Sequence, residues 1–192
     1  MKILLGMPVV RSIPYKTVIS LLQTVKRGVV DCVMIDGSLV YDARDAIAKA
    51  AIDGGYDYVL FVDSDMTFGE LDVESLLKHD TDIVSGLYVT RRGEDLNVCY
   101  KKVIRRRWRR GPELIHDNLK TGYAEIAACG FGFCLIKTEV IKCMSKRYKS
   151  LFEPKWGLGE DIAFCERAKR CGYKIMVDRD VKLGHIGEMV YE

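Results

Sequence analysis

Two aspartates at the end of an apolar run are the feature of this sequence that most suggests chemistry. In "DYVLFVDSDMTF" (57–68), an apolar stretch runs directly into Asp63, Ser64 and Asp65. Because side chains alternate along an extended chain, Asp63 and Asp65 point to the same side if strand geometry continues through Ser64. Adjacent carboxylates repel each other unless a cation lies between them. Oxygen ligands favour a hard ion, Mg²⁺ or Mn²⁺, and the alternative is a solvated turn.

Two further segments carry residue types that fit the same site. Glu160 and Asp161, in "GLGED", begin a predicted helix, where the helix dipole favours carboxylates even without a catalytic role. The loop before them contains Trp156 and Gly159, which suits a mobile platform beside a ligand. His185, in "LGHIG", lies between glycines that allow a close approach of the backbone. An imidazole beside the aspartate pair would suit manganese.

The pattern of elements predicts one α/β domain. Strand-like runs at 2–8, 29–35, 58–62 and 82–89 alternate with helical spacing of apolar residues around 18–25, 43–50 and 73–77. This alternation predicts a parallel sheet with right-handed crossovers. In the first helix, Val18, Leu21, Leu22 and Val25 form one apolar face.

The second half of the chain has a different pattern. Residues 91–113 are polar and basic without a clear period, and strand-like segments follow at 123–128, 131–137 and 173–178. Helical patterns occupy 138–146 and 162–171. These segments predict a small antiparallel addition to the sheet rather than a second domain.

Composition places the chain among ordinary globular proteins. It has 192 residues, of which 48% are hydrophobic and 30% charged, with a net charge of +3. No apolar run approaches the ~18 residues of a membrane span, and "MKILLGMPVVR" reads as a core strand rather than a signal peptide. The seven cysteines form no C-x-x-C pair, which indicates reduced thiols. We therefore expect a cytoplasmic protein.

Four segments, taken in order, resemble the metal-dependent glycosyltransferases with the GT-A fold, in particular small family-2-like members. "YDYVLFVDSDM" is similar to the DXD motif of that group and "DIVSGLYVTRR" to the strand after it. "GEDIAFCERAKRCGYKI" is similar to the E-D motif, and "VKLGHIG" to the closing metal-binding histidine. The resemblance extends from about residue 1 to 187. It implies one Rossmann-like GT-A domain over 1–192, with a mainly parallel central sheet flanked by helices, in which 1–90 bind the nucleotide sugar and 91–192 the acceptor.

The resemblance also implies roles at the donor site. Asp65 and His185 would bind Mn²⁺ or Mg²⁺, which bridges the diphosphate of a UDP-sugar, and Asp63 would hold the ribose or a metal-bound water. The remaining donor-site residues would border or read the base or contact the phosphates, and they are Pro8, Val9, Asp36, Arg44 and Ser64. Arg44 could equally be an exposed helix residue. Asp36 lies in "IDGS", where larger family-2 enzymes have "DDGS" and a longer segment.

On the acceptor side, Asp161 matches the catalytic carboxylate of the family. In an inverting reaction it would take the proton of the acceptor hydroxyl. Glu160 would cap the helix or bind the acceptor, together with Trp156 and Gly159. If the configuration is retained instead, Asp161 need not be a base, and the sequence leaves both outcomes open.

The segment 100–112, "YKKVIRRRWRRGP", concentrates positive charge. Residues 101–110 contain seven lysines and arginines, with Arg105, Arg106 and Arg107 directly before Trp108. Such a run is usually a solvated surface loop, but arginines can also track phosphates while a tryptophan stacks on a base. We favour DNA with a hydroxylated base as the acceptor, which the enzyme would flip out of the duplex. A glycan or an anionic lipid remains an alternative acceptor.

Two other classes of function remain in competition. A sugar-phosphate nucleotidyltransferase also places aspartates at a strand end, but it commonly has a glycine-rich basic loop after the first strand. "GMPVVRSIP" has no such cluster. A non-catalytic nucleic-acid-binding module would explain 100–112 and leave "DSD", "GED" and "GHIG" without a role.

Overall fold

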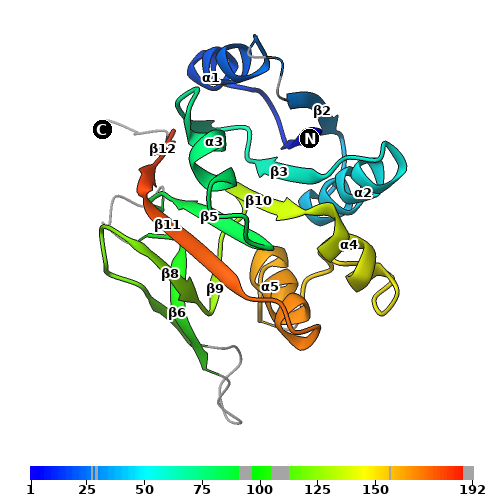
Figure 1. The fold of residues 1–192 in the computed structure, drawn as a ribbon, viewed down its shortest axis with the longest axis vertical. Coiled ribbons are helices and arrows are strands. Elements are labelled where there is room, and N and C mark those ends of the chain that lie inside the picture. Colours follow the sequence, from blue (N-terminus) through cyan, green and yellow to red (C-terminus); the bar gives the residue numbers. More distant parts are fainter. Residues whose placement is uncertain (27, 29, 91–96, 105–112, 156, 188–192) are drawn as a thin grey trace.

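The computed structural model describes the chain except for residues 27, 29, 91–96, 105–112, 156 and 188–192 (Figure 1). Its elements in chain order are β1 (Ile3–Val9), α1 (Tyr15–Lys26), β2 (Val30–Asp36), α2 (Val40–Asp53), β3 (Tyr58–Val62), β4 (Met66–Thr67), α3 (Asp72–Leu77), β5 (Ile83–Leu87), β6 (Cys99–Ile104), β7 (Glu113–His116), β8 (Tyr123–Ile126), β9 (Ala128–Cys129), β10 (Phe133–Lys137), α4 (Thr138–Ser145), α5 (Glu160–Arg170), β11 (Ile175–Lys182) and β12 (Gly184–His185).

A seven-stranded sheet forms the centre, in the order β2-β1-β3-β10-β5-β11-β8. Strand β1 is parallel to β2 and β3, and β5 is parallel to β11. Strand β10 lies antiparallel between β3 and β5, and β8 is antiparallel to β11. Strands β2, β1, β3, β5 and β11 therefore run in one direction. The predicted fold class, a mainly parallel sheet flanked by helices, is confirmed.

Each face of the sheet carries its own apolar core. Along β1, Ile3 and Leu5 belong to the core under α1 and α3, whereas Leu4 belongs to the core under α2, α4 and α5. Strand β3 repeats this alternation, with Leu60 on the first face and Phe61 on the second. A strand buried on both faces reads as a continuous apolar run, which is why these strands could be predicted.

Smaller antiparallel pieces surround the sheet. Strands β7, β6 and β9 form a three-stranded sheet, and β12 pairs with β4. Strand β6 lies within the segment 91–113, where the sequence showed no clear period, and β7 begins at its end; neither strand was predicted. Lys101 and Lys102 of β6 are exposed, whereas 105–112 lie outside the described residues. In Figure 1, β6 lies at the opposite end of the molecule from α1.

Helix α1 departs from its predicted apolar face. Of the four residues that share this face in the sequence, only Leu21 is buried, while Val18, Leu22 and Val25 are exposed. The helix instead turns Thr17, together with Ser20 and Thr24, toward the protein. Periodicity located the helix correctly but did not identify its inward side.

Two further features concern the membrane and the thiols. Within the described part of the chain, no helix combines the length and apolar character needed to cross a bilayer. All seven cysteines are free, as the absence of C-x-x-C pairs indicated. Burial raises the pKa of the Cys99 thiol to about 12, which makes it a poor nucleophile.

Candidate active site

The two aspartates after β3 lie on a turn rather than on a continued strand. The Asp63 amide donates to the carbonyl of Gly132, and the Met66 amide donates to the carbonyl of Asp63. The extended geometry therefore stops at Val62, where β3 ends. As a result, Asp63 and Asp65 have different partners, and the strand alternation from which we predicted that they point to the same side does not extend to Asp65.

Asp63 is paired with a buried arginine of α2. The Arg44 guanidinium donates to Asp63 Oδ1 over 2.7 Å and to Glu160 Oε1 over 2.8 Å. Burial disfavours the charged guanidinium, but the surrounding carboxylates Asp63, Glu160 and Asp161 outweigh this and raise the pKa of Arg44. Its guanidinium also lies 5.6 Å from the ring centroid of Phe131. The positive charge that balances the Asp63 carboxylate is therefore supplied by the protein itself, through Arg44.

The position of Arg44 corrects one alternative from the sequence. Arg44 is only 2% exposed, so it is not an exposed helix residue. Its two hydrogen-bonded carboxylates come from the two segments that carry "DSD" and "GED". Arg44 thus joins Asp63, which is 19 positions away in the sequence, to Glu160, which is 116 positions away. Sequence periodicity carries no signal for such a pairing.

We expect Arg44→Met to destabilise the protein by about 3 kcal/mol, because it leaves two partly buried carboxylates without their counter-charge. Urea unfolding at pH 7 measures this loss. The matched control is Lys49→Met on the same helix, since the Lys49–Asp53 ion pair is exposed and should contribute less than about 1 kcal/mol. Adding Glu160→Gln to Arg44→Met should recover part of the stability. Equal effects of Arg44→Met and Lys49→Met would contradict this account.

Asp65 lies against His185 because β4 and β12 pair. In that pairing His185 is opposite Met66 and Gly184 is opposite Thr67. A Cβ on Gly184 would collide with Thr67 Oγ1, so a larger residue would force the Thr67 side chain to move. The imidazole Nδ1 bonds the Val89 carbonyl over 2.8 Å, and Nε2 lies 3.5 Å from Asp65 Oδ2. The predicted neighbourhood of Asp65 and His185 is present.

The chemistry of this pair fits a cation. A carbonyl can only accept, so Nδ1 carries the proton of the bond to Val89, and in a neutral imidazole Nε2 turns a lone pair toward the Asp65 carboxylate. Both side chains are nearly buried, at 11% and 12% exposure. A proton on Nε2 or a metal ion bound by both groups relieves the facing negative charge. The bond from Nδ1 to a carbonyl is the orientation that metal-binding histidines usually show.

Few side chains at this site are placed to bind a metal ion. Among the described residues, no group of three or more His, Cys, Asp or Glu side chains is placed to hold a metal. Asp63, which the sequence also assigned to the metal, is bonded to Arg44 instead. Asp65 and His185 would therefore be the protein ligands, with other positions left for phosphate oxygens and water, an arrangement that Mg²⁺ commonly adopts.

Asp161 lies in the first turn of α5, two residues after the N-cap Gly159. Burial, and next the charge of Glu160, raise the pKa of Asp161 to about 6, although Arg44 and the Ile162 amide oppose the shift. The Ile162 amide donates to Asp161 Oδ1 over 2.7 Å. A carboxyl group tuned to this range can exchange protons near neutral pH.

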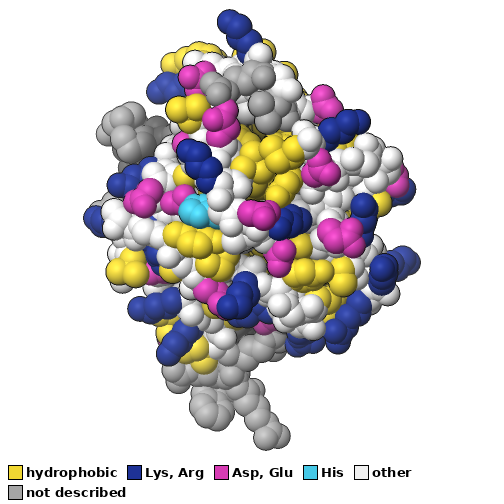
Figure 2. Space-filling view, in the orientation of Figure 1, with side chains coloured by type: hydrophobic (Ala, Val, Ile, Leu, Met, Phe, Trp, Pro, Cys, Tyr) yellow, Lys and Arg dark blue, Asp and Glu magenta, His cyan; other side chains and the backbone are white. Residues whose placement is uncertain are grey.

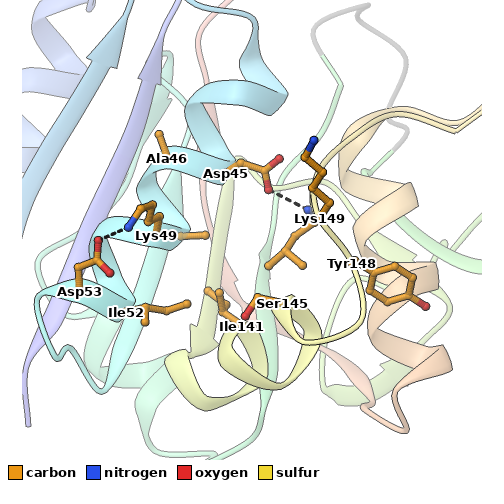
Figure 3. Close-up of a pocket in the computed structure, with 11 residues that line it drawn as sticks. Asp45, Ala46, Lys49, Ile52, Asp53, Ile141, Ser145, Tyr148 and Lys149 are labelled. Atoms are coloured by element: carbon orange, nitrogen blue, oxygen red, sulfur yellow. Dashed lines mark hydrogen bonds and ion pairs between the residues drawn. The ribbon is translucent and has the colours of Figure 1, made fainter.

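Helix α5 is positioned by contacts with the segment 150–153. Figure 3 shows Asp45 of α2 pointing toward this segment, where Asp45 Oδ1 accepts the amides of Leu151 and Phe152. From α5, the buried Arg167 donates to the carbonyls of Leu151 and Glu153. These bonds fix the chain from both sides shortly before Gly159. The sequence analysis missed this supporting role of Asp45 and Arg167.

The other predicted donor residues lie at the same edge of the sheet or beside it. Pro8 is buried and Val9 half-buried at the end of β1, and Val9 is in register with the exposed Asp36 of β2. Ser64 is half-buried in the turn. On the acceptor side Gly159 is exposed, whereas Trp156, Arg105, Arg106, Arg107 and Trp108 lie outside the described residues.

Two cavities border these elements. The larger, of about 480 Å³, lies between α2 and α4 (Figure 3), and none of the predicted site residues line it. The second, of about 370 Å³, is lined by Tyr88, Val89 and Lys182 among others. It adjoins the Asp65–His185 pair, because the Val89 carbonyl bonds His185 and the Tyr88 ring packs edge-on against the His185 imidazole. The sequence analysis did not identify this cavity.

Comparison with known proteins addresses the fold. No protein-family model and no curated protein matches the sequence. Among solved structures, A197 from STIV superposes with a TM-score of 0.66 and 22% identity, over 100% of this chain and 97% of that one. The structure of S. aureus TarS 1–349 in complex with UDP-GlcNAc gives a TM-score of 0.61 and 14% identity, over 100% and 60%.

A third similar structure is GalNAc-T7 with UDP, GalNAc and Mn²⁺, at a TM-score of 0.59 and 12% identity, over 98% of this chain and 44% of that one. The chain has a GT-A-like fold. At these identities the likeness establishes the fold alone. Within a GT-A-like domain, the carboxyl ends of β1 and β3, where the predicted donor residues lie, are the edge at which open α/β sheets bind ligands.

Proposed function

We propose that the protein transfers a sugar from a UDP-sugar to an acceptor hydroxyl with the help of Mn²⁺ or Mg²⁺. The observation that carries the proposal is the pairing of the buried Asp65 with His185 at the edge where Asp161 also lies. Support comes from the fold, because two structures of similar fold were solved with UDP-GlcNAc and with UDP and Mn²⁺. The competing nucleotidyltransferase function has no comparable support.

In this proposal Asp65 and His185 hold the metal, which supplies Lewis-acid stabilisation of the leaving diphosphate. The Val89 carbonyl fixes the imidazole so that Nε2 faces Asp65. Arg44 holds Asp63 in the turn, where its remaining carboxylate oxygen can accept a ribose hydroxyl. Asp63 is thus a positioning contact for the donor rather than a metal ligand.

Asp161 acts as the general base on the acceptor side. With a pKa of about 6, it is mostly ionised at pH 7 and still basic enough to accept the proton of an attacking hydroxyl. The transfer then inverts the configuration at the anomeric carbon. The bonds that fix the segment 150–153 hold α5, and with it Asp161, in place.

The test is a hydrolysis screen of nucleotide sugars with Mn²⁺, read as released nucleotide, which requires no acceptor. We expect release from a UDP-sugar, loss of release with EDTA, and thermal stabilisation by UDP plus Mn²⁺. Release from a GDP-sugar would change the base while keeping the function. Stabilisation by nucleoside triphosphates alone, with no sugar nucleotide cleaved, would instead favour a nucleotidyltransferase.

For the acceptor, we propose DNA carrying a hydroxylated base. Strand β6 carries the exposed Lys101 and Lys102 and leads into the basic run at 105–110. The first residues of the strand lie near the proposed base, since burial and next the charge of Asp161 raise the pKa of Tyr100 to about 12. In this proposal a duplex bound along the basic segment presents a flipped base to Asp161.

Gel-shift titration across a salt series tests the acceptor. We expect log K to fall steeply with log salt, and the triple variant Arg105→Ala, Arg106→Ala, Arg107→Ala to lower the slope by about 2–3. The double variant Lys146→Ala, Lys149→Ala, at exposed positions after α4, is the matched control and should change the slope little. Salt-insensitive or absent binding would reject DNA and favour a glycan or lipid acceptor.

A further inference from the structure

The outward face of α1 is apolar. Its exposed residues include Tyr15 at 70%, Ile19 at 48% and Leu22 at 64% exposure, with Val18 and Val25 at 37% and 39%. At 100° per residue these five side chains fall within about a third of the helix circumference. We call them the α1 stripe. It is as wide as the face that a surface helix normally buries.

A polar contact and a core residue on its inner side fix the orientation of α1. Ser20 Oγ accepts the Phe68 amide over 3.0 Å, while Thr24 Oγ1 donates to the Ser20 carbonyl within the helix over 3.0 Å. Thr17 is completely buried beside them. A rotation that buried the α1 stripe would break the bond to Phe68 and expose Leu21, which packs in the core. The stripe is therefore a stable feature of the fold.

The charges of α1 are all positive. The sequence "YKTVISLLQTVK" contains Lys16 and Lys26 and no acidic residue, and the exposed Arg11 precedes the helix. The neighbouring turn contributes the exposed Leu71 and also Glu70. Figure 2 shows hydrophobic, basic and acidic side chains together at the end of the molecule that α1 occupies in Figure 1.

The size of the α1 stripe distinguishes between two possible partners, a second copy of the chain and a lipid bilayer. A helix of 12 residues is about 18 Å long and about 10 Å wide, so its outer face covers on the order of 200 Å². A stable protein interface needs about 800 Å² from each partner. A second copy packed on α1 alone falls far short of this, whereas binding of a single helix to a bilayer scales with the apolar area that it buries and is strengthened by flanking lysines.

We propose that α1 binds the surface of a bilayer rich in anionic phospholipid, with the α1 stripe in the acyl boundary and Lys16, Lys26 and Arg11 at the headgroups. Since α1 follows β1 by a short loop, the edge with the predicted donor site would lie near the bilayer. Strand β6 lies at the other end of the molecule (Figure 1) and stays accessible.

Vesicle sedimentation tests this proposal. We expect the protein to sediment with vesicles of phosphatidylglycerol and phosphatidylcholine at least about tenfold more than with phosphatidylcholine alone. Leu22→Glu should lower this binding about tenfold. Gln23→Glu is the matched control, because it adds the same charge at an exposed flanking position of α1 and should change binding much less. The basic segment contributes equally to both variants.

Equal sedimentation of Leu22→Glu and Gln23→Glu would overturn the proposal, because binding would then be purely electrostatic. A dimer in analytical ultracentrifugation that Leu22→Glu converts to a monomer, without vesicle binding, would assign the stripe to a second copy instead. Nucleotide-sugar hydrolysis should be unchanged in Leu22→Glu. The outcome is thus separable from the proposed function, which fails only if hydrolysis is absent in every variant.

Discussion

Asp65→Asn is expected to reduce UDP-sugar hydrolysis and transfer by about 10²–10³-fold. It weakens the binding of a metal ion that supplies several kcal/mol of transition-state stabilisation. The same change should abolish the thermal stabilisation by UDP plus Mn²⁺. Asparagine is nearly isosteric and neutral, so it also removes the negative charge facing His185 Nε2. Folding of the variant is checked by circular dichroism before activity is measured.

The matched control for this experiment is Asp31→Asn. Asp31 is exposed on β2 and bonds only the Tyr56 hydroxyl among the contacts described, so its loss should leave both hydrolysis and the Mn²⁺ response unchanged. His185→Gln should reproduce the effect of Asp65→Asn in part. A full Mn²⁺ response in Asp65→Asn would mean that the metal binds elsewhere.

Asp161→Asn is expected to lower transfer by about 10²–10⁴-fold, the contribution of a positioned general base. The wild-type rate should rise with pH through an apparent pKa of about 6, because the base must be ionised, and this rising limb should vanish in the variant. Rates are measured from pH 4.5 to 8.5 as kcat/KM, because this ratio reports the pKa of the free enzyme. A rate that is unchanged in the variant would point to a retaining reaction without a base at this position.

The same substitution should stabilise the folded protein at high pH. The carboxyl group has a pKa of 3.8 in its ordinary environment and about 6 in the folded state. A raised carboxyl pKa contributes stability below pH 4, and that stability is lost as the pH rises through 6. Asp161→Asn removes this loss, so we expect about 1–2 kcal/mol of added stability at pH 8 and almost none at pH 4. Urea unfolding at the two pH values measures the difference.

Glu160→Gln provides the control for the pH dependence of the transfer rate. The negative charge of Glu160 is the second cause of the raised pKa of Asp161, after burial. Its removal should therefore move the rising limb of the pH–rate profile to lower pH without eliminating it. A limb that stays in place would mean that another group sets the pH dependence.

The sequence predicted the parts of this protein that depend on local pattern. Strands buried on both faces read as apolar runs, and helices appeared as apolar spacing, so the sheet could be derived in outline. The neighbourhood of Asp65 and His185 was implied by the family resemblance, and Gly184 gave a local signal because a Cβ there would collide with the Thr67 side chain.

The missed features depend on contacts between distant residues. Arg44 bonds Asp63 and Glu160 across the fold, and no local pattern predicts such a pairing. Strands β6 and β7 were missed because β6 is rich in lysine. Its antiparallel hydrogen bonds with β7, rather than its composition, make it a strand. The inner side of α1 was assigned wrongly because hydroxyl groups, which bond locally, replaced the apolar residues that usually face a core.

The place of β10 in the sheet determines whether the two halves of the chain could fold separately. This strand comes from the second half of the chain and lies between β3 and β5, which both come from the first half. A fragment that ends near residue 90 would leave both neighbours with open edges, so it would not form a native sheet on its own. The two halves of the chain are therefore regions of one cooperative unit, and exchanging one half for that of a protein of similar fold would require rebuilding the centre of the sheet.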